Sequence, residues 1–102
     1  MAIPLVINQG EIVSNEEEFV IDGDIDNSGT INNLSDGIIE VNIPNTIINQ
    51  DSGTINNDGK IALISAERSP NNGFLNYGLI NNNNNGIIDT NRLSIKSYGT
   101  IK

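Results

Sequence analysis

The chain has 102 residues, the length of one small domain, with 36% hydrophobic residues and a formal net charge of −8. It contains no Cys and no His, so it lacks disulfides, the best zinc ligands, the commonest nucleophile and the commonest general base. The negative charge argues against nucleic-acid binding, and no apolar run approaches the ~18 residues of a membrane span. We therefore expect no cofactor, no metal, no nucleic-acid partner and no membrane insertion.

The pattern Gly-x-Ile, or a close variant of it, recurs along the chain and uses all ten glycines. The units begin at Gly10, Gly23, Gly29, Gly37, Gly53, Gly59, Gly73, Gly78, Gly86 and Gly99. Asn45 and Asn91 begin two further units, and Asn is the usual replacement for Gly where φ must be positive. Since isoleucine favours strands, we interpret each unit as a short strand that follows a corner.

The units are grouped in threes, and each group spans about twenty residues. In chain order, the predicted parts are a degenerate first coil (1–22), two regular coils (23–64), an extruded loop (65–72), a third regular coil (73–91) and an incomplete last coil (92–102). The first coil begins with an apolar strand from Ile3 to Ile7. Pro70 keeps the loop out of the strand ladder, because proline has no N–H to donate.

The middle units of the three regular coils match closely, as GTINN, GTINN and GLINN. Self-similarity at this period is typical of a β-solenoid. The sequence therefore predicts one all-β domain over residues 1–102, a single-stranded triangular β-solenoid (β-helix). It would have three short parallel strands per coil and about four to five coils of ~20 residues each.

Alternation of side chains along each strand predicts an aliphatic core made of stacked columns. The first column is Ile12, Ile31, Ile55, Ile80 and Ile101. The second is Ile25, Ile47, Leu75 and Leu93, and the third wall contributes Ile39, Val41, Ile61, Leu63 and Ile88. The same register stacks Asn33, Asn57 and Asn82 at one corner, where their amides can form a ladder along the axis.

Five consecutive asparagines, Asn81 to Asn85, raise the alternative that this region is a disordered low-complexity tract. The repeat argues against disorder, because Ile follows almost every Gly two residues later while the residue between them varies. We expect Asn81 to point outward and Asn83 to Asn85 to form the turn that leads to Gly86.

The repeat resembles that of β-solenoid proteins, including the filamentous-haemagglutinin-like adhesins and related surface proteins with Gly-x-Ile-Asn-Asn repeats. The resemblance covers the chain from about Gly10 to Ile101. It implies the solenoid fold and a surface or filament protein, although the motif specifies a fold more than a function. There is a looser similarity to bactofilins, cytoplasmic solenoids that polymerise end to end, from which the asparagine corners differ.

Two acidic segments are candidate sites. Asp22, Asp24 and Asp26 resemble the start of a calcium loop, but an EF-hand needs Gly at Asn27 and Glu at Asn33. These carboxylates are therefore expected to be solvated. Glu16 to Glu18 are expected to form an exposed acidic loop, with an interaction patch as the alternative. Since a short coil stack offers little cleft for paired carboxylates, we expect no enzymatic activity.

Threonines form a second candidate surface on the outer face of the middle wall. Thr30 and Thr54 would stack there, beside outward-facing asparagines. Regular threonine columns resemble the ice-binding surfaces of antifreeze solenoids. Leu79 interrupts the column, and threonine also suits any strand surface.

Charge is divided along the chain, and in a solenoid this means along the axis. Residues 1–51 hold ten acidic residues and no Lys or Arg, whereas residues 52–102 hold three acidic residues and all five basic ones. Both ends would also present open strand edges. The pattern predicts head-to-tail self-association, with the apolar strand Ile3 to Ile7 completing the unfinished last coil of a neighbour.

The interface residues predicted at the N-terminal end are Ile3, Leu5, Ile7, Glu11, Glu16, Glu17 and Glu18. Those predicted at the C-terminal end are Arg92, Leu93, Ile95, Lys96, Ile101 and Lys102. The expected function is a non-enzymatic subunit of a homopolymeric filament or fibre, with an adhesin that binds a receptor or glycan as the alternative and ice binding as the third. We expect the protein outside the cell or on a cell or virion surface. The cytoplasm is the alternative, because the start of the chain has no basic region typical of a signal peptide.

Overall fold

The computed structural model describes residues 2–3, 6–8, 10–14, 18–21, 24–42, 46–64, 73–83, 86–90 and 95–102. All regular secondary structure in these ranges is strand. The strands are β1 (Ala2–Ile3), β2 (Val6–Asn8), β3 (Glu11–Ser14), β4 (Glu18–Ile21), β5 (Ile25–Asn27), β6 (Thr30–Asn33), β7 (Ile38–Asn42), β8 (Ile47–Asn49), β9 (Thr54–Asn57), β10 (Lys60–Ile64), β11 (Phe74–Asn76), β12 (Leu79–Asn82), β13 (Ile87–Asp89), β14 (Ile95–Ser97) and β15 (Thr100–Ile101).

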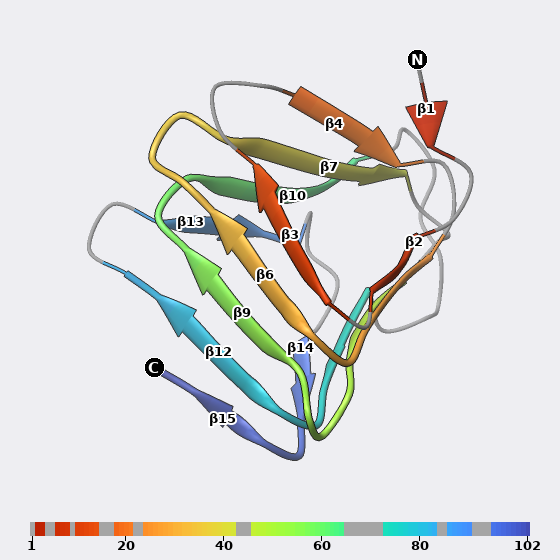
Figure 1. Ribbon diagram of the computed structural model, residues 1–102, viewed down its shortest axis with the longest axis vertical. Coiled ribbons are helices and arrows are strands. Elements are labelled where there is room, and N and C mark those ends of the chain that lie inside the picture. The colour runs from red at the N-terminus through yellow and green to blue at the C-terminus, as the bar shows by residue number, and fades with distance from the viewer. Residues whose placement is uncertain are drawn as a thin grey trace.

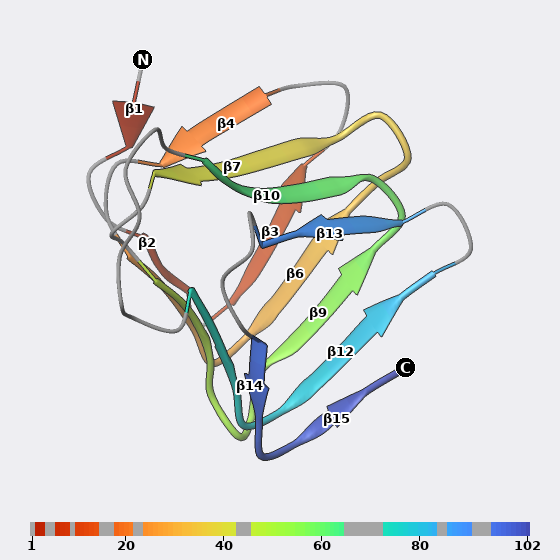
Figure 2. The same ribbon diagram turned by 180° about the vertical axis from the view of Figure 1, so that it is seen from behind.

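The strands form three parallel sheets of five strands each, which are the three walls of a triangular solenoid (Figures 1 and 2). Sheet A has the order β1-β4-β7-β10-β13, sheet B has β2-β5-β8-β11-β14, and sheet C has β3-β6-β9-β12-β15. Every pairing joins one coil to the next. The predicted all-β triangular solenoid with three parallel strands per coil is therefore confirmed.

The coils are numbered by their strands. Coil 1 contains β2, β3 and β4, coil 2 contains β5 to β7, coil 3 contains β8 to β10, and coil 4 contains β11 to β13. Coil 5 contributes β14 to sheet B and β15 to sheet C. β1 adds one more strand to sheet A, above coil 1. The loop predicted at 65–72 lies outside the described residues.

The first predicted core column is in register along sheet C. Ile31, Ile55 and Ile80 are buried, and Ile12 lies opposite Ile31, although the side chain of Ile12 is outside the described part. Ile101 continues the register opposite Ile80, but it is 43% exposed. The expectation that Ile101 is a core residue is wrong for the described part of the chain, in which no strand of sheet C follows β15.

The second column differs from the prediction by one residue. Phe74, and not Leu75, lies opposite Ile47, and Phe74 is fully buried whereas Leu75 is only partly buried. Ile95 continues this column opposite Phe74, while Leu93 lies outside the described residues. The reason is that Asn76 aligns with Asn49 at the end of the strand, and this buried pair fixes the register.

This register makes a mutational prediction. Phe74→Ala should lower the free energy of unfolding by about 3–5 kcal/mol, because it removes a fully buried ring and leaves a cavity. Leu75→Ala, its neighbour on the outer face, should cost about 1 kcal/mol or less. Urea unfolding followed by circular dichroism measures both. A larger loss for Leu75→Ala would contradict the observed register.

Corner glycines are required for a different reason from the one expected. A Cβ at Gly78 would overlap the carbonyl oxygens of Gln50 and Gly53 in the preceding coil. The backbone at Gly78 does not adopt a positive φ. Glycine is therefore needed here because adjacent coils approach closely at the corner, and not because of the left-handed conformation that the sequence pattern suggested.

Candidate functional site

Asparagine side chains run through the interior of the solenoid at two corners. At the end of sheet C, Asn33 Nδ2 donates to Asn57 Oδ1 at 2.8 Å, and Asn57 Nδ2 donates to Asn82 Oδ1 at 2.9 Å. This is the ladder that the repeat predicts. Asn33 and Asn57 are completely buried, and Asn33 Nδ2 also donates to the backbone oxygen of Gly37 at 3.2 Å. The Asn33 amide therefore joins the two sides of its own corner and also bonds to the equivalent corner of the next coil.

A second ladder at the end of sheet B was missed in the sequence. Asn8 donates to Asn27, Asn27 to Asn49, and Asn49 to Asn76, with Nδ2 to Oδ1 distances of 2.8, 2.8 and 2.9 Å. Asn76 Nδ2 then donates to Ser97 Oγ at 3.2 Å. A signal was present: in coils 1, 2 and 4, an Asn stands two residues before the corner glycine.

A third ladder lies on the outer face of sheet C. Asn56 Nδ2 donates to Asn32 Oδ1, and Asn81 Nδ2 donates to Asn56 Oδ1, both at 2.8 Å. Asn81 is partly exposed there. Beside this ladder, Thr30, Thr54, Leu79 and Thr100 stand in register, so Leu79 interrupts the threonine column as the sequence indicates. Asn83 is exposed, and Asn84 and Asn85 lie outside the described residues.

The two inner ladders have the same direction, because each Nδ2 donates to the next Oδ1 towards the C-terminal end. The sheet C ladder therefore begins with an acceptor, Asn33 Oδ1, which is buried and has no hydrogen-bond partner. Ser14 is the residue opposite Asn33 in the preceding coil. A buried unpaired oxygen of this kind costs free energy relative to one that accepts a hydrogen bond.

Ser14→Asn should therefore stabilise the protein. An amide at this position can donate to Asn33 Oδ1 and extend the ladder by one coil, which adds about 1 kcal/mol to the free energy of unfolding. The melting temperature should rise by about 4–8 °C, and differential scanning calorimetry measures it. Ser14→Ala is the control, since it adds no donor. An equal or lower melting temperature for Ser14→Asn than for Ser14→Ala would contradict this expectation.

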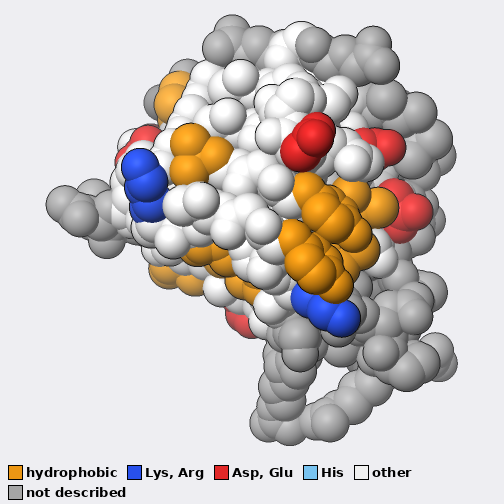
Figure 3. Space-filling view, turned by 90° about the horizontal axis from the view of Figure 1, so that it is seen from below, with side chains coloured by type: hydrophobic (Ala, Val, Ile, Leu, Met, Phe, Trp, Pro, Cys, Tyr) orange, Lys and Arg blue, Asp and Glu red, His pale blue; other side chains and the backbone are white. Residues whose placement is uncertain are grey.

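The C-terminal end of the coil stack exposes apolar side chains. Ile88 and Ile95 are partly buried against the core, and Ile101 is more exposed. The rings of Tyr77 and Tyr98 stack with centroids 5.1 Å apart, and Lys96 Nζ lies 5.8 Å from the Tyr98 centroid. Seen from below Figure 1, where β14 and β15 lie lowest, exposed hydrophobic side chains gather beside Lys or Arg side chains (Figure 3).

The N-terminal end consists of the edge strands β1, β2 and β3. The stretch Ile3 to Ile7 was expected to be one strand, but it is divided between β1 in sheet A and β2 in sheet B. Pro4 stands between them in the sequence, and proline lacks the N–H that a strand ladder needs. Ala2 and Ile3 pair with Val20 and Ile21, so β1 covers one wall of coil 1.

The predicted interface residues fall into two groups. Those on described strands or at their ends are Ile3, Ile7, Glu11 and Glu18 at the N-terminal end, and Ile95, Lys96, Ile101 and Lys102 at the C-terminal end. Those outside the described residues are Leu5, Glu16, Glu17, Arg92 and Leu93. The first group lies in the coils at the two ends of the stack, and their role as an interface stays a prediction.

The acidic candidates in coil 2 make contacts to coil 3. Asp24 Oδ1 accepts a hydrogen bond from Thr46 N at 2.7 Å, and Asp26 Oδ1 accepts one from Gln50 Nε2 at 3.0 Å. No group of three His, Cys, Asp or Glu in the described ranges could hold a metal ion. The carboxylates of Asp24 and Asp26 therefore contribute to the contact between coils.

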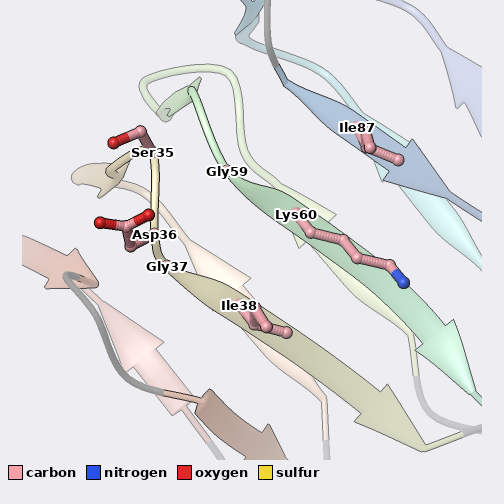
Figure 4. Close-up of a pocket in the computed structure, with 7 residues that line it drawn as sticks. All are labelled: Ser35, Asp36, Gly37, Ile38, Gly59, Lys60 and Ile87. Carbon is pink, nitrogen blue, oxygen red and sulfur yellow. The ribbon is translucent and has the colours of Figure 1, made fainter.

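A shallow depression lies on the outer face of sheet A. Ile38, Lys60 and Ile87 come from three adjacent strands and project to the same side of the sheet, with Ser35 and Asp36 at the turn beyond them (Figure 4). Ile87 is 56% exposed. Because Asp36 is the one carboxylate among the seven lining residues, the depression has no pair of acids for acid-base chemistry.

Comparisons with known proteins give no match to a protein-family model, to a curated protein or to a solved structure. Among the residues that the structure describes, no helix is long and apolar enough to cross a membrane.

Proposed function

We propose that this protein is a non-enzymatic structural subunit that assembles head to tail into a β-solenoid filament or fibre. The observation that carries the proposal is a one-strand offset between the two ends. At the N-terminal end, sheet A has an extra strand, β1, above coil 1. At the C-terminal end, coil 5 has strands in sheets B and C, and sheet A ends one coil earlier with β13.

The proposed joint makes use of this one-strand offset. If a second copy stacks below the first, its β1 pairs with β13 and becomes the third wall of coil 5. Its β2 and β3 then pair with β14 and β15, so that all three sheets continue across the joint. Open strand edges readily pair with other strands, and a head-to-tail contact that does not close on itself produces a filament.

Charge and apolar surface support the same contact. Lys96 and Lys102 lie in coil 5, while Glu11 and Glu18 lie in coil 1. Opposite charges at the two ends favour one polarity and faster association. Burial of Ile101, which is 43% exposed in the isolated subunit, adds a hydrophobic contribution.

The setting of the filament is part of the proposal. The resemblance to filamentous-haemagglutinin-like surface proteins favours a place outside the cell or on a cell or virion surface, and the looser similarity to bactofilins favours the cytoplasm. A fibre of this kind is built from backbone pairing and asparagine ladders, which need neither a cofactor nor a catalytic residue.

Negative-stain electron microscopy of the purified chain tests the proposal. We expect unbranched polymers at low salt, and the double variant Lys96→Glu, Lys102→Glu should shift the protein towards monomers, because acidic residues then meet acidic residues. Lys60→Glu is the matched control, since it reverses the charge of an exposed lysine in coil 3, away from both ends, and should leave the polymers intact. Monomers at all concentrations and salt levels would overturn the proposed function.

A further inference from the structure

The proposed filament rests on complementary ends, and the corner glycines specify how those ends meet. We propose that a second copy of this chain docks in continuous register, so that Gly10 of one subunit packs against the corner of Gly99 in its neighbour. The joint would then be indistinguishable from an internal coil-to-coil contact. This inference rests on the proposed function and adds to it one defined register.

The first observation is the space around the corner glycines that follow sheet B. At Gly53, Gly78 and Gly99, an added Cβ would overlap backbone oxygens of the preceding coil. Gly10 stands at the same corner in coil 1, and an added Cβ there would meet nothing within 4 Å. Gly10 also has no positive φ, so the isolated subunit gives no steric or conformational reason for glycine at this position.

The second observation is a chain of hydrogen bonds at the same corner. Thr54 N donates to Gly29 O at 2.9 Å, Leu79 N to Gly53 O at 3.0 Å, and Thr100 N to Gly78 O at 2.8 Å. In each case the residue after a corner glycine donates to the corner glycine of the preceding coil. The same rule applied across the joint pairs Glu11 N with Gly99 O of the neighbour, and this brings Gly10 against that neighbour's corner.

The sheet B ladder supports the same register. Asn76 Oδ1 accepts two hydrogen bonds, from Gly78 N at 3.2 Å and from Asn49 Nδ2 in the preceding coil at 2.9 Å. Asn8 Oδ1 accepts the equivalent bond from Gly10 N at 3.2 Å, and coil 1 is the first in its sheet. In the joint, Ser97 Oγ of the neighbour takes the place of the preceding asparagine, and its hydroxyl can donate to Asn8 Oδ1.

Gly10→Ala tests this register with a single methyl group. In the isolated subunit the methyl points into open space, so the melting temperature should stay the same or rise slightly, because alanine restricts the unfolded chain. In the joint the methyl meets the neighbour's backbone, and subunit addition should weaken at least about tenfold. Sedimentation velocity and negative-stain imaging measure assembly, and calorimetry measures folding of the same samples.

A mixing experiment makes the test independent of overall stability. The Gly10→Ala subunit keeps its native C-terminal end, so it can add to the N-terminal end of a wild-type polymer and then block further growth there. One variant in ten subunits should limit wild-type polymers to roughly ten subunits, as expected for a terminator of a head-to-tail chain. Asp51→Ala, an exposed turn residue in coil 3, is the control and should leave polymer length unchanged.

The outcomes separate the two proposals. Wild-type polymers together with a folded, monomeric Gly10→Ala protein that shortens those polymers are the expected result. Wild-type polymers that Gly10→Ala joins as readily as wild type would overturn the register and leave the filament standing. A wild-type chain that never polymerises would overturn both, and with it would favour a preceding coil supplied within a longer chain as the group that covers Gly10.

Discussion

Asn57→Asp should be among the most destabilising single-atom changes in this protein, with a loss of about 4–5 kcal/mol in the free energy of unfolding at neutral pH. Asn57 Nδ2 donates to Asn82 Oδ1 at 2.9 Å and to the backbone oxygen of Ile87 at 3.1 Å. A carboxylate would place a charged acceptor against these two acceptors. The side chain is fully buried, so water cannot stabilise the charge.

The effect should depend on pH in a defined direction. The buried carboxyl introduced at position 57 is more stable when protonated, so its pKa in the folded state lies above the usual value of about 3.9. The part of the penalty that comes from the charge is absent below about pH 4 and grows as the pH rises from there to the raised folded-state pKa. A smaller loss remains in acid, because a protonated carboxyl has one donor where the Asn57 amide donates two hydrogen bonds. The difference in unfolding free energy between wild type and Asn57→Asp should therefore shrink in acid. Urea unfolding at several pH values measures it.

Asn56→Asp is the matched control, one residue earlier on the same strand. Asn56 also belongs to a ladder, with 2.8 Å hydrogen bonds to Asn32 and from Asn81, but it faces outward and is partly exposed. Water can solvate a carboxylate there, so the loss should be about 1 kcal/mol or less. Similar losses for the two variants would show that burial of the inner ladder does not control stability.

The regular part of this fold could be predicted because the constraint is local and repeated. Each coil must bury an aliphatic residue and turn a corner, so Ile31, Ile55 and Ile80 recur with the same neighbours in the sequence, and they lie in register. The ladder of Asn33, Asn57 and Asn82 follows from the same alignment. A period in the sequence becomes a column in space wherever adjacent coils have equivalent strands.

Prediction failed where the repeat changes length or ends. The spacing from Gly73 to its strand is one residue shorter than in coil 2, so counting from glycine selected Leu75, whereas the buried Asn76 fixes Phe74 as the inward residue. Ile101 matches the pattern of a core residue, but burial also needs a following coil. The spacing of the repeat shows which residues occupy equivalent positions in successive coils. It does not show whether another coil packs against a given residue.

The glycines show a second limit of the sequence pattern. A glycine at a corner is compatible with a positive φ and with a close approach of another backbone, and the sequence alone does not distinguish them. The structure does, because the preceding coil's carbonyl oxygens occupy the Cβ positions at Gly53, Gly78 and Gly99, and none of these residues has a positive φ. The same corner in coil 1 differs, because an added Cβ at Gly10 would meet no atom within 4 Å. Close approach of another backbone therefore does not explain the glycine at position 10 in the isolated subunit.

Gly78→Ala should therefore cost about 3 kcal/mol, whereas Gly10→Ala should cost nothing in the isolated subunit. The added methyl at Gly78 would overlap the carbonyl oxygens of Gln50 and Gly53. Both are backbone atoms, so coils 3 and 4 must separate to relieve the overlap. Separation strains the hydrogen bonds of Tyr77 N to Asn49 O at 2.8 Å and of Leu79 N to Gly53 O at 3.0 Å.

The comparison uses the same substitution at equivalent corners of coils 4 and 1, so helix and strand propensities of alanine cancel. Unfolding should be measured at a concentration and salt level where the protein is monomeric, because assembly would add its own stabilisation. If close coil packing determines the need for glycine, only Gly78→Ala lowers the urea midpoint. Equal losses at both positions would mean that backbone conformation, and not the neighbouring coil, selects glycine at these corners.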